Sequence, residues 1–535
     1  MKPTTRQNLL VALTYSVTLI GGMVLGYKFL KDQGFTLERS VQYASNKEEK
    51  VGQIINLINR NYVDEINADT LSHMEIDSLL HQLDPHSVYL PPAKANEQTE
   101  LLGGGFEGIG VEYYVLNDTL LITNVVKDGP AAMAGLKLGD KILRIDSIFV
   151  SGKKLRRDQM IGKIKGRKGT AVKLLILHPG NSQPAALTIK RGRVNVSSID
   201  AAYMINNDAG YIRISEFGAN TDKDFVESVR ALKAKGMKKL ILDLRDNGGG
   251  YLTAATGLAN QILPENKLIV YTEGKHEPRT DYIATGGGEF EEGKLAVLIN
   301  ENSASASEIL AGAVQDLDRG IIVGRRSFGK GLVQEQFPFG DGSALNLTIA
   351  RYYTPLGRSI QKSYKRGYTA YQNEIEDRFH DGELTQRNLG LRDSMNKNAV
   401  YVTGSGKKVF AGGGIQPDIY VKMDTTGMNK FYNTLLSKGV LFDYVFDVLA
   451  NRYTATFLEQ NLTTFSINDT DYKDFIRFIQ ARNVAIDNKQ LASSRPVIYN
   501  DLKALLYKYH LGDTGYYKAV NLNDDMVKQA ISGLQ

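Results

Sequence analysis

Between about residues 203 and 353, short apolar runs alternate with segments long enough to form helices. The clearest runs are Leu240–Leu242, Leu295–Ile299 and Gly320–Val323. Alternation of this kind is typical of helices layered on a sheet. We therefore predict an α/β core in this part of the chain.

Other parts of the chain have a different pattern. Residues 103–196 contain short strand-like runs separated by turns, which predicts a small, mostly β module. Helical spacing over residues 46–82 stops at Asp84-Pro85-His86, and helical patterns return beyond Asp424. Residues 363–408 are polar and tyrosine-rich without a clear period, so we expect an inserted loop region there.

The length of 535 residues is enough for about three to five domains. We predict a multidomain α/β protein. Its expected parts are a membrane anchor (1–30), an N-terminal helical segment (31–100), a β-rich module (101–196), an α/β core containing the insertion (197–424) and a helical C-terminal region (425–535).

The N-terminal stretch from Gln7 to Tyr27 carries no charge over 21 residues. About 20 apolar residues are enough to span a bilayer. A cleaved signal peptide has a shorter apolar region followed by small residues, whereas this run meets Tyr27-Lys28, so we favour an uncleaved anchor over a signal peptide or a buried helix. Positive charges lie on both sides of the run and only weakly favour a cytoplasmic N-terminus. The expected location is the inner membrane, single-pass, with the bulk of the chain periplasmic.

Composition excludes several kinds of chemistry. The chain has no cysteine, which removes disulfides, thiol nucleophiles and cysteine zinc sites. The net charge of +6 is spread along the chain without a long basic run, so a nucleic-acid surface is not indicated. No H-E-x-x-H motif occurs, and we predict neither a metal nor a cofactor.

Two glycine-rich strings resemble nucleotide-binding motifs but lack their context. Gly103–Gly108 is followed by a β-like segment, whereas a dinucleotide fingerprint opens a helix. Gly324–Lys330 spells G-x-x-x-x-G-K, yet Gly331 stands where a phosphate loop has the Ser or Thr that holds magnesium. A nucleotide-dependent enzyme using this loop remains an alternative that ATP-dependent turnover would favour.

A serine lies at a predicted strand-to-helix turn. Ser305 follows the apolar run Leu295–Ile299 and precedes the helix-forming segment from Glu308. Ser305-Ala306-Ser307-Glu308 also fits a capping box, in which the serine only satisfies the first backbone donors of the helix. However, small alanines flank Ser305, and the amides of a helix N-terminus can stabilise an oxyanion. Both a cap and an acyl-transfer nucleophile are therefore open.

A serine nucleophile needs a base, and the sequence offers Lys330 among glycines and apolar residues. Lysine acts as a base only when neutral, which burial can achieve by lowering its pKa. Gln334, four residues on, could orient the lysine nitrogen without adding charge. The alternative is that Lys330 is a solvated loop lysine.

Several strings together resemble the carboxyl-terminal processing peptidases over about residues 45–362 and 408–422. These strings are Leu83–Ser87, Asp243–Gly250, Asn302–Ile309, Phe328–Gln334, Tyr353–Gly357 and Gly413–Asp418. The resemblance implies a crotonase/ClpP-like protease core with Ser305 as nucleophile, Lys330 as base and Gln334 orienting it. It also implies an oxyanion hole made by the backbone amides of Gly250 and Ala306. The insertion and the long C-terminal tail depart from the family pattern.

The same resemblance identifies the β-rich module as a PDZ domain. Its carboxylate-binding loop would be Gly108-Ile109-Gly110-Val111, and Gly129–Asp140 is its most recognisable string. Glycines let successive amides converge on an anion, and a neighbouring strand edge can accept an extended peptide. Without the resemblance, an ordinary β turn would explain the loop equally well.

The expected function is a membrane-anchored serine endopeptidase that recognises and cleaves proteins near their C-termini with a Ser/Lys dyad. Its partners would be proteins or peptides with free C-termini and the membrane, with an adaptor or a homo-oligomer as further options. The alternative is a catalytically silent PDZ scaffold, against which the intact Ser305, Lys330 and Gln334 argue.

Overall fold

The computed structural model describes residues 68–116, 119–151, 162–179, 181–386 and 399–535, together with residues 18, 21, 22, 52, 54 and 58. It divides into two units, residues 1–76 and 77–535. The predicted anchor at residues 7–27 falls almost wholly outside the described residues. Within the ranges described, no helix combines the length and hydropathy that a membrane crossing requires.

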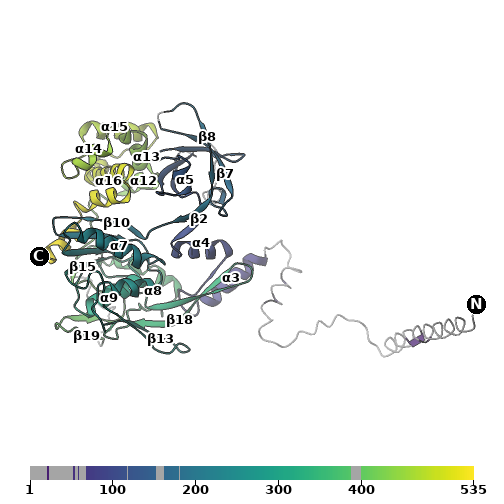
Figure 1. The fold of residues 1–535 in the computed structure, drawn as a ribbon, viewed down its shortest axis with the longest axis vertical. Coiled ribbons are helices and arrows are strands. Elements are labelled where there is room, and N and C mark those ends of the chain that lie inside the picture. The colour runs from purple at the N-terminus through teal and green to yellow at the C-terminus, as the bar shows by residue number, and fades with distance from the viewer. Residues whose placement is uncertain are drawn as a thin grey trace, which may run out of the picture. The chain divides into compact units, whose positions relative to one another are not determined.

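A six-stranded sheet forms the centre of the α/β core, as the alternating pattern predicts (Figure 1). Its first two strands pair antiparallel and the others parallel, the arrangement of an α/β sheet with one antiparallel edge. In spatial order the strands are β10 (Ile199–Met204), β11 (Ala209–Ile214), β12 (Lys239–Asp243), β15 (Lys294–Ile299), β16 (Ile321–Gly324) and β21 (Ile419–Tyr420).

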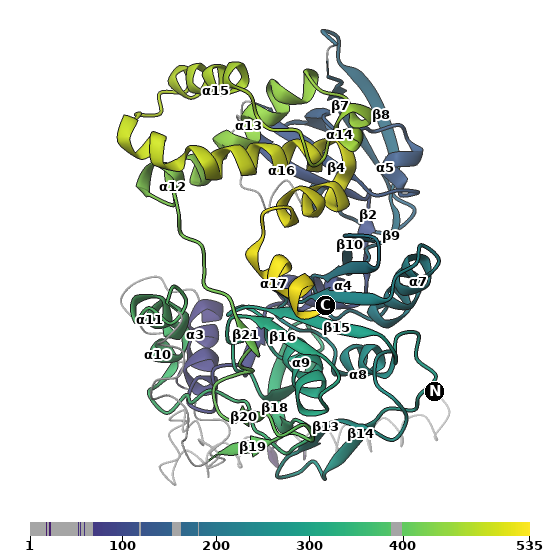
Figure 2. The ribbon, with the colours of Figure 1, turned by 90° about the vertical axis from the view of Figure 1, so that its left-hand side faces the viewer.

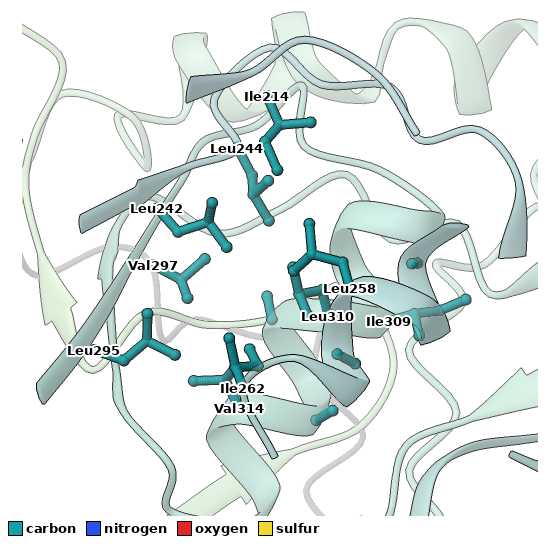
Figure 3. Packing of buried hydrophobic residues seen from close by; sticks show 14 of the residues in the cluster. Ile214, Leu242, Leu244, Leu258, Ile262, Leu295, Val297, Ile309, Leu310 and Val314 are labelled. Carbon is teal, nitrogen blue, oxygen red and sulfur yellow. The ribbon is translucent and has the colours of Figure 1, made fainter. Parts of the chain in front are cut away.

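Helices cover both faces of this sheet. On one face, α7 (Thr221–Lys233), α8 (Leu252–Asn260) and α9 (Ala306–Asp316) bury a large apolar cluster, part of which Figure 3 shows. On the other face, α17 (Asp525–Gly533) packs against the alternate side chains of the same strands. Leu240 and Leu242 belong to the first cluster and Ile241 to the second, because successive side chains of a strand point to opposite faces.

A second sheet joins the N-terminal helical segment to the core. The segment contains α3 (Ala68–Leu80) and α4 (Pro92–Leu102). The sheet follows the order β1-β18-β13-β14, and β17 also pairs with β18. These strands are β1 (Val88–Leu90), β13 (Leu268–Glu273), β14 (Thr280–Ile283), β17 (Leu332–Pro338) and β18 (Ala344–Tyr353).

The β-rich module has its own sheet and its own apolar core. The strands are β3 (Val111–Leu116), β4 (Thr119–Val125), β5 (Lys141–Ile145), β6 (Ile148–Phe149), β7 (Ala171–Leu177) and β8 (Ala185–Lys190), with the short helix α5 (Pro130–Met133). Strand β3 lies at an edge of this sheet. The strands β2 (Gly105–Gly108) and β9 (Gly192–Asn195) pair where the chain enters and leaves the module.

The C-terminal region is helical, as predicted (Figure 2). It has a separate core rich in aromatic side chains. Its helices are α12 (Lys430–Ser437), α13 (Val440–Asp447), η2 (Leu449–Asn451), α14 (Ala455–Gln460), α15 (Asp469–Ala481), α16 (Asn488–Asn521) and α17. A break at Gly512, which has a φ of 65°, divides α16.

The insertion is not a plain loop, so that expectation is wrong for its described part. It contains α10 (Tyr368–Gln372), α11 (Glu374–His380) and β19 (Val400–Val402), which pairs with β20 (Lys408–Phe410). The helices are too short to produce a recognisable period. They are held instead by individual buried residues, Tyr371 and Arg378.

Candidate active site

Ser305 sits at the turn between β15 and α9. It is the N-cap residue of α9, and its φ of 55° and ψ of −114° lie in a region that residues with a Cβ rarely adopt. Strained backbone of this kind clusters at functional sites. The predicted strand-to-helix turn is therefore present, and Ser305 stands directly before Ala306, the first residue of α9.

A cleft with a volume of about 750 Å³ surrounds this serine. Its lining includes all five residues to which the family resemblance assigns a catalytic or oxyanion role, namely Ser305, Lys330, Gln334, Gly250 and Ala306. The PDZ loop residues Gly108–Val111 do not line it. The structure thus brings together residues from three separate segments of the sequence, and the predicted peptide-binding loop is not part of this lining.

The glycine-rich loop after β12 approaches Ser305 closely. A Cβ at Gly249 would lie 2.8 Å from the Ser305 Cβ and 3.1 Å from the Ala306 amide nitrogen, so a side chain there would collide with Ser305. Asn247 holds the loop, because its Oδ1 accepts from the Gly249 N–H and its carbonyl from the Ala304 N–H. Among the hydrogen bonds of the described residues, none is donated by the amide of Gly250 or Ala306.

The buried carboxylate of Glu308 ties the serine segment to the lysine segment. It accepts hydrogen bonds from the backbone N–H of Ser305 (2.8 Å), Gly329 (2.7 Å) and Lys330 (2.9 Å) and from the Ser327 hydroxyl (2.6 Å). Burial raises the pKa of Glu308 to about 7 although these hydrogen bonds oppose the shift. The capping-box glutamate is therefore also the connection between the two predicted catalytic residues.

Lys330 lies just before β17 with its ammonium group largely removed from water. Burial lowers its pKa to about 8, and the negative charges of Glu308 and Asp84 limit that shift. A pKa in this range leaves a useful fraction of neutral lysine near pH 8. The solvated-loop alternative for Lys330 does not agree with this environment.

Gln334 is fixed by a network that begins at the Asp84-Pro85-His86-Ser87 turn. The Ser87 hydroxyl donates to Asp84 (2.7 Å) and accepts from the Thr348 backbone N–H (3.1 Å). The Gln334 side-chain NH₂ in turn donates to the Thr348 hydroxyl (3.2 Å). This leaves the Gln334 Oε1 as the atom of the amide that can accept a hydrogen bond in the cleft.

Sequence reasoning gave no role to two further residues at the site. His86 lines the cleft, and its Nε2 lies 2.7 Å from the Tyr371 hydroxyl of the insertion. Burial and the nearby charge of Lys330 lower the His86 pKa to about 3, which keeps the imidazole neutral. The Tyr352 hydroxyl donates to the Lys330 carbonyl (2.5 Å) and also lies 3.1 Å from the Ser305 carbonyl oxygen. Neither contact has a local sequence signal, because the partners are far apart in the chain.

The predicted PDZ loop connects β2 to the edge strand β3. The carbonyls of Ile109 and Gly110 accept hydrogen bonds from Ala131 (2.8 Å) and Val126 (3.0 Å) inside the module. Gly110 has a φ of +79°, and a Cβ there would come within 3.2 Å of the Val194 methyl groups. A small residue with left-handed backbone is therefore needed at Gly110. No group of acidic or histidine side chains in the described residues could hold a metal ion.

A PDZ module, an α/β core with both faces covered, and a serine and a buried lysine in one cleft define the class as a serine protease with a peptide-binding domain. The model of peptidase family S41 matches residues 208–368 and that of the PDZ domain residues 108–189. Residues 431–512 match a family of unknown function, DUF8443.

A carboxy-terminal-processing protease of Bartonella bacilliformis is 32% identical over 365 residues, covering 68% of this chain and 83% of that protein. The carboxy-terminal processing protease CtpB of Bacillus subtilis is 33% identical over 317 residues, which are 59% of this chain and 65% of CtpB. The chain belongs to the carboxy-terminal-processing proteases of family S41.

Solved structures include a photosystem II D1 C-terminal processing protease, which is 24% identical with a TM-score of 0.34 and covers 69% of this chain and 91% of its own. The PDZ domain of a carboxy-terminal protease from Vibrio cholerae, solved in complex with a peptide, is 34% identical with a TM-score of 0.16. It covers 17% of this chain and 99% of its own.

Proposed function

We propose that this serine-type carboxy-terminal-processing protease uses Ser305 as its nucleophile, Lys330 as its general base and Gln334 to orient the lysine. The observation that carries the proposal is the single cleft in which a serine at a strained helix N-cap and a desolvated lysine are tied to the same buried carboxylate. A protease uses such an arrangement to cleave a peptide bond through an acyl-enzyme.

In the first step, neutral Lys330 accepts the Ser305 hydroxyl proton while Oγ attacks the scissile carbonyl carbon. The oxygen of the tetrahedral intermediate takes up negative charge, which the amides of Gly250 and Ala306 stabilise. The intermediate collapses when the C–N bond breaks and Lys330 returns the proton to the leaving amine. A water molecule, deprotonated by Lys330, then releases the acyl group and regenerates Ser305.

Lys330 is the better base of the two candidates in the cleft. With a pKa of about 3, His86 is neutral but binds a proton too weakly to take one from a serine hydroxyl efficiently. Lys330, with a pKa near 8, binds it far more strongly. The Oε1 of Gln334 would accept a hydrogen bond from the lysine Nζ and so direct its lone pair, without adding a charge that would keep it protonated.

The PDZ module selects the substrate in this proposal. The loop Gly108–Val111 would bind the terminal carboxylate through its amides, and the free edge of β3 would pair with the last residues of the substrate. Residues 7–27 would anchor the chain in the inner membrane with the catalytic part periplasmic, which the uncharged run supports. Fractionation of cells, followed by protease added from outside, tests that location.

Replacing the nucleophile tests the proposed chemistry. Ser305→Ala is expected to lower peptide hydrolysis by at least about a thousandfold, while the lost cap costs only about 0.5–2 kcal/mol of stability. Ser228→Ala is the control, since that hydroxyl binds the Asp224 carbonyl within α7. Purified variants are compared by hydrolysis rate and by labelling with a fluorophosphonate. Comparable hydrolysis by Ser305→Ala would place the nucleophile elsewhere.

A further inference from the structure

The N-cap residue of helix α17 contacts the segment that leads into the loop carrying the proposed oxyanion donor, through the pair of Asp524 with Arg245. Helix α17 packs against β15 and β16 on the face of the sheet opposite α9 (Figure 2). Its buried side chains are Met526, Val527 and Ala530. The C-terminal region, which lies outside the span matched by the peptidase family, therefore contributes part of the protease core.

The carboxylate of Asp524, the N-cap residue of α17, both caps the helix and pairs with Arg245. Its Oδ1 accepts from the backbone N–H of Met526 (2.8 Å) and Val527 (3.2 Å), which caps the helix. Its Oδ2 accepts from the Nη1 of Arg245 at 2.5 Å. The side chains of Asp524 and Arg245 are 13% and 14% exposed, so this ion pair is largely shielded from water.

Arg245 belongs to the segment that leads into the glycine-rich loop. Its Nε and Nη2 donate to Asp243, at 2.9 Å and 2.6 Å, which fixes one edge of the guanidinium group. The remaining edge faces Asp524, and the other acceptor near Nη1 is the weakly accepting Met526 sulfur at 3.9 Å. Asp524 is thus the charged group that fixes the second edge of the guanidinium.

We propose that Asp524 is a positioning residue for the oxyanion hole: through Arg245, it sets the loop that places the Gly250 amide beside that of Ala306. The inference rests on the oxyanion role proposed above for Gly250. The loop packs so closely on Ser305 that little displacement is tolerated, as the 2.8 Å contact for a Cβ at Gly249 indicates. Loss of the Arg245 contact would move the amide relative to the developing charge.

Asp524→Asn keeps the helix cap but removes the ion pair with Arg245. Asparagine caps a helix about as well as aspartate, but it carries no charge. We expect kcat to fall about tenfold, since small misplacements of catalytic groups have effects of this size. The KM and the affinity for a C-terminal peptide should stay unchanged. The matched control is Asp525→Asn, which removes a neighbouring carboxylate. Among the described residues its ion pair is with Lys528, at 3.3 Å, and its loss should leave kcat unchanged.

A transition-state analogue separates positioning from a general loss of folding. A peptide boronate forms a tetrahedral adduct that uses the oxyanion hole, whereas a product peptide does not. For Asp524→Asn in the full chain, the inhibition constant of the boronate should rise about tenfold, in parallel with the loss of kcat. The dissociation constant of the product peptide should not change. Both constants are measured on the folded fraction of the protein. Their ratio therefore reports on the oxyanion hole even if the variant melts at a lower temperature.

Three outcomes would overturn the inference. The first is an unchanged boronate-to-product ratio in Asp524→Asn, and the second is an equal effect in Asp525→Asn. In an Arg245→Gln background, Asp524→Asn should cause no further loss of kcat, because the pair acts as a unit; an additive loss also overturns it. If instead Ser305→Ala remained active, the proposed function itself would fail, and that result is independent of Asp524.

Discussion

The protease cleft and the PDZ loop differ in the kind of group that each presents, side chains in the cleft and backbone amides in the loop. In the cleft, the groups proposed to act are half-buried side chains. One buried carboxylate, that of Glu308, connects the segments of Ser305 and Lys330. In the loop Gly108–Val111, the groups proposed to bind are backbone amides next to an open strand edge. Side chains are needed where a proton must move, while backbone amides are enough to hold a charge in place.

This difference predicts which kind of substitution each region tolerates. The cleft depends on protonation states, so a variant that keeps size and charge can still abolish activity. The loop depends on backbone conformation and space, so changes of pH near neutrality should affect it little. The predictions below test this contrast, beginning with the largest expected effect.

Lys330→Arg should lower kcat/KM by about a thousandfold, because a guanidinium group stays protonated and cannot accept the serine proton. Lys362→Arg is the matched control: Lys362 is also buried and pairs with Glu374 at 3.1 Å, a contact that arginine retains. Steady-state hydrolysis of one peptide by both variants provides the comparison. If Lys330→Arg kept more than about a tenth of the activity, a loss of less than ~1.4 kcal/mol, the lysine would be a binding residue.

The pH dependence should follow Lys330. Its pKa of about 8 predicts that kcat/KM falls as the pH drops below 8, because protonation removes the base. At pH 6 we expect about a hundredth of the plateau value from the titration of Lys330 alone. Protonation of Glu308, with a pKa of about 7, partly opposes this loss, because it removes a negative charge that raises the pKa of Lys330. Peptide binding to the PDZ loop should not change over the same range.

Glu308→Gln sharpens this test because it removes a negative charge that raises the pKa of Lys330. The acid limb of kcat/KM should therefore move to lower pH, although the plateau falls as well. Glu301→Gln, which removes another buried carboxylate, one that pairs with Arg325 at 2.7 Å, should leave the limb in place. A wild-type limb centred near pH 6.5 would indicate a histidine base instead.

The sequence was sufficient for the parts of this site that are local. The turn at Ser305, the capping glutamate and the glycine string of the PDZ loop are each contiguous, so pattern and turn chemistry reveal them. The family motifs then indicated Lys330 and Gln334. The α/β core and the helical C-terminal region followed from hydrophobic periodicity, which reports burial directly.

The remaining features depend on contacts between distant segments. The pairing of His86 with Tyr371 joins the N-terminal segment to the insertion, and that of Asp524 with Arg245 joins the last helix to the core. No periodicity encodes such pairs, because each partner satisfies its local pattern without the other. Glu308 is intermediate, since its cap was predictable but its contacts with the Lys330 segment required the fold.

Peptide selection should depend on the free C-terminal carboxylate. Amidation removes the charge that the amides around Gly110 would hold, so binding to the full chain carrying Ser305→Ala should weaken by about 1.5–3 kcal/mol. Gly110→Ala should weaken it to a similar or smaller extent, because its Cβ meets the Val194 methyl groups at 3.2 Å. Gly169→Ala is a matched control, since Gly169 also has a positive φ, +90°, but open space around it. Calorimetric titration with acid and amide forms of one peptide gives the comparison. Equal affinities for the two forms would mean that the loop holds no carboxylate and that the cleft or an adaptor selects the substrate.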